Sequence, residues 1–483
     1  MKERDNSFCH YRLPYHLPYQ RTRIDIEMLQ RISLDGSDAS WVQGRPYESL
    51  LSYIPRSEWT AIRAGTSTLD VSGYIQTAIN AGVPLAVPEG TYCIGSTIYL
   101  KSRTVMRGMG APTRTLIKAL STMASRNMID VTDYSDGTGV YAQSDIVLDG
   151  IGFDGNGVTA GTDQFMLRLF SVDGLAVRHC YFKNHTFGFL GIGGCRGVYI
   201  EGCEFTTWGV TPLTGVAGPI AVWLAGNPTG GDDTPTSRAR VTNCYFHDGY
   251  GPAIGDYSTD SIVATCNIED VTECGIYSQR YNGGSASADN EALRHTINGC
   301  RINGVRRNAI SAAGIEIAAS GATITGCSIT DTDDTGLKIY SKANDVTVTG
   351  CHIWDVVKQQ ASYATYTNYG HITLINMASQ DMAGIIIGGC RLGNIDVAPT
   401  AKYAITLTNL NGAGHYIASV NISGNNVVNG FTTAAFFEHN TPISATDTAS
   451  AICDNIGAAD LYNPAILNMA LAGRQLTTAA MIP

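Results

Sequence analysis

Carboxylate side chains recur at related places along this chain and are its best candidates for chemistry. Glu316 stands in the apolar stretch 314–319, while Glu273 and Asp256 lie beside similar short stretches. Cleavage of a glycosidic bond commonly uses two carboxyl groups, one giving a proton and the other activating water or attacking directly. We therefore predict that Glu316 is a catalytic carboxyl group and that Glu273 or Asp256 works with it.

Each of these acids also has a structural interpretation. Glu316 could simply form an ion pair with Lys338 on the surface. Asp256 and Glu273 could cap turns, because short acidic side chains bind nearby backbone N–H groups. A further acidic turn, Asp331 with Asp333 and Asp334, is the reserve candidate, and Asp248 is a weaker one.

Aligning the short apolar stretches places chemically active residues in columns. Gly255, Tyr277, Glu316 and Lys338 fall in one outward column, and Asp256 lies one place beyond it. In the preceding turns, residues 270–275 align with 331–336, and the segment between them carries Arg306 and Arg307. Acids on both sides of a basic pair predict a groove that holds a polar chain and tunes the carboxyl pKa values.

Aromatic residues near these columns could stack on the apolar faces of sugar rings, although each could equally be a packing residue. Two tryptophans flank the long insertion 206–240, and residues 278–290 are a candidate wall of the groove. The predicted substrate-binding residues are Trp208, Trp223, Tyr257, Tyr277, Tyr281, Arg306, Arg307, Lys338 and Tyr340.

These columns depend on an internal repeat marked by cysteine. Cys180 and Cys244 each precede a Tyr-Phe pair, Cys203 precedes Glu-Phe, and Cys266, before Asn-Ile, continues the frame. The shortest steps are 22 to 24 residues, and longer steps indicate inserted loops. Each repeat alternates apolar and polar residues, which is the strand period. Short strands of this kind bury their apolar side only by stacking coil on coil, so we predict a β-solenoid with an interior column of free cysteines: Cys180, Cys203, Cys244, Cys266, Cys300, Cys327, Cys351 and Cys390.

Composition excludes several classes of function. The net charge of −10 gives no basic stripe for nucleic acid. The 13 cysteines contain no CxxC pair and the histidines are scattered, so we expect no metal and no cofactor. Without an apolar leader or a run of 18 apolar residues, we expect neither a signal peptide nor membrane insertion.

Three regions follow from these patterns. Residues 1–54 hold a basic and aromatic arm with a short helical pattern, too small for a core of its own. Residues 55–430 contain the solenoid, entered through an amphipathic helix over 70–82 that would cap the first coil. Residues 431–483 lose the cysteine frame and are rich in Ala and Thr.

The order Asp70…Ile75-Gln76-Thr-Ala78-Ile79…Pro88-Glu-Gly-Thr-Tyr92…Leu100…Gly108-Met-Gly110 resembles the entry segment of the pectate-lyase-like β-helix superfamily, above all phage tailspikes and capsule depolymerases. The resemblance covers about residues 55–430. It implies an all-β fold, the right-handed parallel β-helix. It also implies a homotrimer held by its C-terminal part, with residues 1–54 docking onto phage tail, portal or adaptor proteins.

The function implied by the resemblance is that of a virion tailspike, made in the host cytoplasm, that recognises and cleaves host cell-surface polysaccharide (O-antigen, capsule or exopolysaccharide). The paired acids favour endoglycosidic hydrolysis. The alternatives are a polysaccharide lyase on the same fold, a receptor-binding spike without enzymatic activity, and a cellular C5-epimerase or secreted wall enzyme. The superfamily contains hydrolases, lyases and epimerases, so the fold alone does not choose among them.

Overall fold

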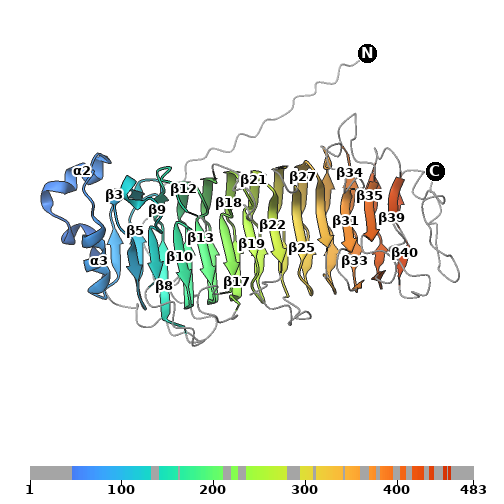
Figure 1. The fold of residues 1–483 in the computed structure, drawn as a ribbon, viewed down its shortest axis with the longest axis horizontal. Helices are drawn as coiled ribbons and strands as arrows, with labels where there is room; N and C mark the ends of the chain where they lie inside the picture. The colour runs from blue at the N-terminus through green and yellow to red at the C-terminus, as the bar shows by residue number, and fades with distance from the viewer. Residues whose placement is uncertain are drawn as a thin grey trace, which may run out of the picture. The chain divides into compact units, whose positions relative to one another are not determined.

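In a computed structural model of the chain, stacked coils form a right-handed parallel β-helix (Figure 1). The structure describes residues 46–131, 141–161, 164–209, 219–226, 235–279, 294–307, 312–340, 343–358, 369–376, 381–394, 403–409, 416–428, 434–439, 450–453 and 455–457. The described strands form three long parallel sheets, called here sheets A, B and C, which confirms the predicted fold class. Each coil contributes one strand to each sheet in turn.

Sheet A has 14 strands: β1 (Glu48–Ser49), β2 (Leu85–Val87), β5 (Val105–Gly108), β8 (Gln143–Asp149), β11 (Val172–Arg178), β14 (Arg196–Glu201), β17 (Ser237–Thr242), β20 (Ile262–Ala264), β23 (Thr296–Asn298), β26 (Thr323–Thr325), β29 (Thr347–Thr349), β33 (Ile386–Gly388), β37 (Asn421–Ser423) and β40 (Ala451–Cys453). Sheet B has 13: β3 (Gly90–Ile94), β6 (Thr115–Ala119), β9 (Gly152–Asp154), β12 (Tyr181–His185), β15 (Glu204–Trp208), β18 (Tyr245–Gly249), β21 (Asn267–Thr272), β24 (Arg301–Arg306), β27 (Ser328–Thr332), β30 (His352–Trp354), β34 (Arg391–Gly393), β38 (Asn426–Val428) and β41 (Ile456–Gly457).

Sheet C has 12 strands: β4 (Ile98–Leu100), β7 (Ile129–Val131), β10 (Leu167–Phe170), β13 (Leu190–Gly193), β16 (Val222–Ala225), β19 (Ile254–Asp256), β22 (Cys274–Gln279), β25 (Ala313–Ala318), β28 (Thr335–Tyr340), β31 (Gly370–Asn376), β35 (Tyr403–Asn409) and β39 (Ala434–His439). A small pair, β32 (Met382–Ala383) and β36 (Ile417–Ala418), lies outside these sheets. The helices are η3 (Leu50–Tyr53), η4 (Arg56–Glu58), α2 (Trp59–Ala64), α3 (Ser72–Asn80) and η5 (Ser121–Met123).

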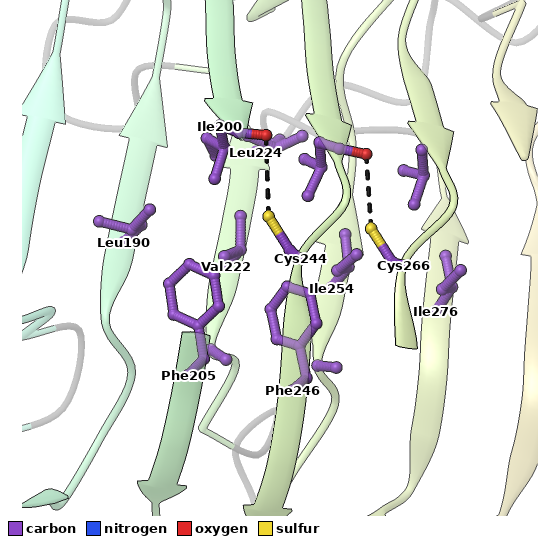
Figure 2. Close-up of a cluster of buried hydrophobic side chains, with 14 of the residues drawn as sticks. Leu190, Ile200, Phe205, Val222, Leu224, Cys244, Phe246, Ile254, Cys266 and Ile276 are labelled. Atoms are coloured by element: carbon purple, nitrogen blue, oxygen red, sulfur yellow. Dashed lines mark hydrogen bonds between the residues drawn. The ribbon is translucent and has the colours of Figure 1, made fainter. Parts of the chain in front are cut away.

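The cysteine column lies inside the solenoid, as predicted. All eight cysteines named for it are buried and free of disulfides. The thiols of Cys244 and Cys266 point back to backbone carbonyls of the preceding coil, Ile200 O at 3.8 Å and Val241 O at 3.5 Å (Figure 2). The column closes with Asn425 and Asn455, whose side-chain amides bond from coil to coil at 3.0 Å.

The residue before each cysteine forms the corner between sheets A and B. Gly202, Gly299 and Gly326 have φ values of 61°, 62° and 61° there, and Asn243 has 54°. Glycine and asparagine adopt this left-handed conformation with the least strain. The recurring Gly-Cys pair in the sequence therefore has a geometric cause: the corner needs a positive φ, and the next side chain turns inward.

Aromatic side chains stack beside the cysteine column. Phe153, Phe182, Phe205 and Phe246 come from successive strands of sheet B, with ring centroids 5.2, 4.9 and 4.6 Å apart. Figure 2 shows Phe205 and Phe246 against the aliphatic residues of sheet C. Like residues stack because parallel coils repeat the same inward position, and the burial of these rings supplies much of the driving force for folding.

The N-terminal end of the solenoid is covered, as the amphipathic pattern predicts. The side-chain amide of Gln76 in α3 bonds the backbone of the edge strand β4 twice, to Tyr99 O at 3.0 Å and from Tyr99 N at 2.8 Å. This side chain therefore replaces a missing neighbouring strand. At the edge of sheet A, β1 pairs with β2, and Leu50 beside it is fully buried.

We expect the Gln76→Ala protein to be less stable and more prone to associate through β4. Loss of both hydrogen bonds at a half-covered edge should cost about 1–2 kcal/mol of the free energy of unfolding. Thermal unfolding and light scattering on heating measure these effects. The control is Thr77→Ala on the same exposed part of α3, which should behave almost as the unchanged protein; equal losses in both proteins would contradict the role of Gln76.

The coils extend past residue 430. Strands β39, β40 and β41 add to sheets C, A and B, so the solenoid reaches Gly457. The predicted docking arm falls mostly on residues 1–45, and the end of the predicted trimer segment on 458–483; both lie outside the described residues. In the described part of the chain, no helix is long and apolar enough to cross a membrane.

Candidate functional site

The outward column of sheet C is the structural basis of the candidate site. Strand pairing aligns Gly255 with Tyr277, Tyr277 with Glu316, and Glu316 with Lys338. The register predicted from the repeats is therefore correct. Trp223 on β16 extends the same column by pairing with Gly255. Side chains at these positions project from one face, because neighbouring coils repeat the same orientation.

At the two positions where the column holds glycine, Gly191 and Gly255, aromatic rings from nearby residues cover the backbone. A Cβ atom on Gly255 would stand 3.4 Å from the ring of Tyr257, and one on Gly191 would overlap the ring of Phe165. The rings contact each other across coils: Phe165 stacks on Trp223 at 5.7 Å, Trp223 meets Tyr257 at 6.3 Å, and Tyr257 meets Tyr277 at 5.8 Å. We call Phe165, Trp223, Tyr257, Tyr277 and Tyr340 the aromatic stripe.

Glu316 lies on β25, between the strands that carry Tyr277 and Tyr340, and is 5% exposed. Its Oε2 atom is 3.2 Å from Nζ of Lys338, and it accepts a hydrogen bond from the thiol of Cys274 at 3.6 Å. Nζ of Lys338 also lies 4.5 Å from the centre of the Tyr340 ring. The ion pair considered from the sequence therefore exists, but both partners are largely buried instead of exposed.

The tyrosines of the stripe form a hydrogen-bonded chain. The hydroxyl of Tyr277 donates to Oε1 of Gln279, so the oxygen of Tyr277 is left to accept from Tyr340 at 2.8 Å. Burial is the largest cause that raises the pKa of Tyr257, Tyr277 and Tyr340, and the carboxylate of Glu316 adds to it. All three phenols therefore stay protonated; the protons of Tyr277 and Tyr340 are engaged within the chain, and the hydroxyl of Tyr257 can donate to a ligand.

The two acids predicted to assist Glu316 lie in different places. Glu273 is 8% exposed, in the turn that leads into β22 and directly before Cys274. Its charge contributes to the raised pKa of both Cys274 and Tyr257, so it lies near the stripe. Asp256 is next to Gly255 in β19 and faces the other way, paired with Leu224 and Ser278.

Asp256 belongs to a buried network that holds a turn. Its carboxylate accepts hydrogen bonds from the hydroxyls of Ser258, at 2.6 Å, and of Ser261. His295 lies 3.8 Å away and bonds Ser278 on its other ring nitrogen. Asp256 is 1% exposed, and both of its carboxylate oxygens are engaged in this network. Its side chain points away from the column that carries Glu316, so the structure does not place the two acids together.

The basic pair and the acidic turn bind each other. Arg306 pairs with Asp331 and lies 3.7 Å from Asp333, and Arg307 pairs with Asp334. Backbone N–H groups reinforce the turn, since that of Arg307 donates to Asp333 at 2.8 Å. These five side chains stabilise the corner between sheets B and C, so their charges are already compensated within the protein.

Trp208 corrects one prediction. Its side chain is fully buried in the core, 6.2 Å from the ring of Phe189, and cannot stack on a sugar. Strict alternation along β15 would put it outside with Glu204 and Thr206. Thr207, however, has a φ of 58°, and this left-handed residue reverses the direction of the next side chain. Gly249 on the next coil leaves the space that the indole fills.

Sequence reasoning missed Phe165, Cys274 and Gln279. Phe165 lies before its strand, and its ring covers Gly191 of the next coil. The repeat in the sequence does not predict this contact. Gln279 directly follows Ser278 and could have been found by extending the column by two residues. Tyr281 and most of the candidate wall 278–290 lie outside the described residues. The described residues hold no cluster of three or more His, Cys, Asp or Glu side chains placed to bind a metal ion.

Comparison with known proteins agrees with the fold. The family described as right-handed β-helix region matches residues 167–311. No curated protein matches the sequence. Among solved structures, the A-module of the mannuronan C-5 epimerase AlgE6 from Azotobacter vinelandii is similar, with a TM-score of 0.58, 13% identity, and coverage of 86% of this chain and 99% of that one.

Two further solved structures resemble the chain. The surface protein and adhesin PfbA of Streptococcus pneumoniae has a TM-score of 0.57 and 14% identity, with coverage of 82% of this chain and 99% of that one. The tailspike protein of E. coli bacteriophage HK620, solved with a pentasaccharide, has a TM-score of 0.52 and 12% identity, with coverage of 84% and 80%. At these identities the similarity concerns the fold, and function must be argued from the site.

Proposed function

We propose that this protein binds a polysaccharide chain along the aromatic stripe and cleaves it beside Glu316. The observation that carries the proposal is the stripe itself: rings on successive coils, in contact from Phe165 to Tyr277, lead to the pair of Glu316 and Lys338. Successive coils lie ~4.8 Å apart, so a polymer crossing them meets the rings of Trp223, Tyr257 and Tyr277 in turn, while Phe165, which is 5% exposed, supports Trp223 from within. Flat aromatic surfaces suit the apolar faces of sugars, and the tyrosine hydroxyls suit their polar edges.

The cleavage step would use Glu316 as a catalytic carboxyl group, with Glu273 as its partner. Glu273 precedes the coil of Glu316 by one step, since Cys274 pairs with Ala313. Asp256 is left out because it is engaged in its own network. Two carboxyl groups of this kind can protonate the leaving oxygen and activate water, with the tyrosines binding the sugar hydroxyls.

Hydrolysis is favoured over a lyase reaction because the basic side chains near the stripe are engaged in ion pairs within the protein. A lyase needs a base and must neutralise the acidic sugar that it cuts. Near the stripe, Lys338 is held by Glu316, Arg306 by Asp331, and Arg307 by Asp334. The raised pKa values of Tyr257, Tyr277 and Tyr340 make these phenols poor bases.

We further propose that the protein is a tailspike of a phage virion, assembled as a homotrimer and acting at the host cell surface. Support comes from the resemblance of the entry segment to tailspikes and from the solenoid shared with the tailspike of bacteriophage HK620. In this proposal residues 1–54 dock onto the tail, portal or an adaptor protein, and 431–483 stabilise the trimer. Light scattering at micromolar concentration tests the assembly, and a monomer would contradict it.

To test the activity, the protein is incubated with a panel of bacterial O-antigens, capsules and exopolysaccharides. The masses of any oligosaccharides released are then measured by mass spectrometry. Hydrolysis adds one water per cut, whereas a lyase leaves a double bond that absorbs in the ultraviolet. Saturated fragments from one of the polymers are the expected result. Tight binding with no fragments would instead identify a receptor-binding spike without enzymatic activity.

The Trp223→Ala protein should bind this polysaccharide about tenfold more weakly or worse, because removal of a central aromatic contact commonly costs more than 1.4 kcal/mol of binding free energy. Calorimetry or surface binding with purified oligosaccharide measures the change. The matched control is Trp354→Ala, since Trp354 is a half-buried tryptophan on the outer face of sheet B, over which Arg391 lies. Equal weakening in the two proteins would place the glycan elsewhere.

A further inference from the structure

Cys274 stands apart from the cysteine column. It begins β22 in sheet C, where its backbone pairs with that of Ala313, whereas the column lies at the corner between sheets A and B. The column thiols bond backbone carbonyl groups, as Cys300 does to Val263 O at 3.7 Å. The thiol of Cys274 instead contacts a side chain, Oε2 of Glu316, at 3.6 Å. This thiol therefore has a position that the packing of the solenoid does not require.

Two donors meet on the same oxygen of Glu316. Nζ of Lys338 lies 3.2 Å from Oε2, the atom that also accepts from Cys274. Within the described part of the chain, no hydrogen bond reaches the other oxygen, Oε1. A carboxylate held by one oxygen keeps a fixed rotation about its last bond, so its second oxygen points in a defined direction. Such orientation matters for proton transfer, which requires the reacting atoms within hydrogen-bond reach.

Burial, and next the charge of Glu316, raise the pKa of the Cys274 thiol well above its usual range. A thiolate beside this carboxylate would repel it, whereas the protonated thiol donates to it. The donor role of Cys274 is therefore retained over the whole pH range in which a carboxylate acts. The residue is 4% exposed and does not need to touch a ligand to have this effect.

We infer that Cys274 is a positioning residue for Glu316: together with Lys338 it holds Oε2 and thereby presents Oε1 to the glycosidic bond. This inference rests on the proposed cleavage at Glu316. It assigns the thiol to the orientation of the carboxylate, and not to nucleophilic attack, metal binding or disulfide formation.

The test uses the full-length protein and the polysaccharide that it cleaves. In the Cys274→Ala protein, kcat should fall about three- to tenfold while KM stays unchanged, because a weak hydrogen bond that orients a group is lost and the stripe is intact. The Cys274→Ser protein keeps a donor and should recover most of the lost kcat.

The matched control is Cys300→Ala, which removes a buried thiol of the column that has no contact with the stripe. Its kcat and KM should equal those of the unchanged protein. Thermal unfolding of all three variants separates loss of fold from loss of orientation. A Cys274→Ala protein with unchanged kcat overturns the inference, as does a Cys274→Ser protein that behaves like the alanine variant. If Glu316→Gln itself cleaves normally, the proposed function fails first, and the two failures are thus distinguishable.

Discussion

The Glu316→Gln protein is expected to cleave the polysaccharide at least roughly a hundredfold more slowly than the unchanged protein, because a positioned acid or base contributes about 10²–10⁴ to the rate. Glutamine has nearly the same size and can still accept hydrogen bonds from Lys338 and Cys274. The solenoid and the stripe should therefore remain, and oligosaccharide should bind with similar affinity. Initial rates measured by reducing-end assay, together with binding by calorimetry, separate these two properties.

The control for this prediction is Glu269→Gln. Glu269 is half-buried on the outer face of sheet B and accepts a hydrogen bond from Tyr245 at 2.8 Å, so Glu269→Gln removes the same charge at a site away from the stripe. Its rate should stay within a factor of about two of the original, as expected for a surface change. If Glu316→Gln cleaves at the original rate, the assignment is wrong, and the acids of the turn 331–334 become the next candidates.

The second large effect concerns the core. Phe205→Ala should lower the free energy of unfolding by about 3–5 kcal/mol, because it removes a fully buried ring from between Phe182 and Phe246 and leaves a cavity in the stack. Since neighbouring coils support each other, we expect the loss to be felt first in the coils next to Phe205.

Denaturant unfolding gives the total change, and hydrogen exchange of the backbone amides shows where it occurs. The control is Tyr181→Ala, which removes a partly exposed ring from the outer face of the neighbouring strand β12. It should cost less than about 1 kcal/mol. A similar loss in both proteins, or exchange that rises equally in every coil, would contradict the stacked-core account.

Much of this structure is predictable because a solenoid repeats its own geometry. Once the coils are aligned on their second strands, the pairing of Tyr277 with Glu316 and of Glu316 with Lys338 follows. The glycine before most of these cysteines marks the corner, and the free state of the thiols follows from their place in one column. Register along parallel strands is the property that periodic sequence encodes best.

Predictions fail where the period is broken. Thr207 has a left-handed backbone conformation, and Trp208 after it therefore points into the core. The pattern of apolar residues does not predict this change of direction. Tyr257 directly follows its strand, and its ring folds back over Gly255 of the column. The alternation along a strand does not predict such a contact, because the residue lies outside the strand. The orientation of the Asp256 carboxylate depends on its contacts with Ser261 and His295. His295 lies one coil away, and the spacing of residues in the sequence does not predict this contact.

The most direct test of the central claim is a structure of the Glu316→Gln protein with an oligosaccharide of the polymer that the unchanged protein cleaves. We expect the sugar chain to run across the coils of sheet C, with rings stacked on Trp223 and Tyr257, and with a glycosidic oxygen within hydrogen-bond distance of residue 316. Sugar bound on the outer face of sheet A or B, or along the stripe with no linkage near residue 316, would contradict the account.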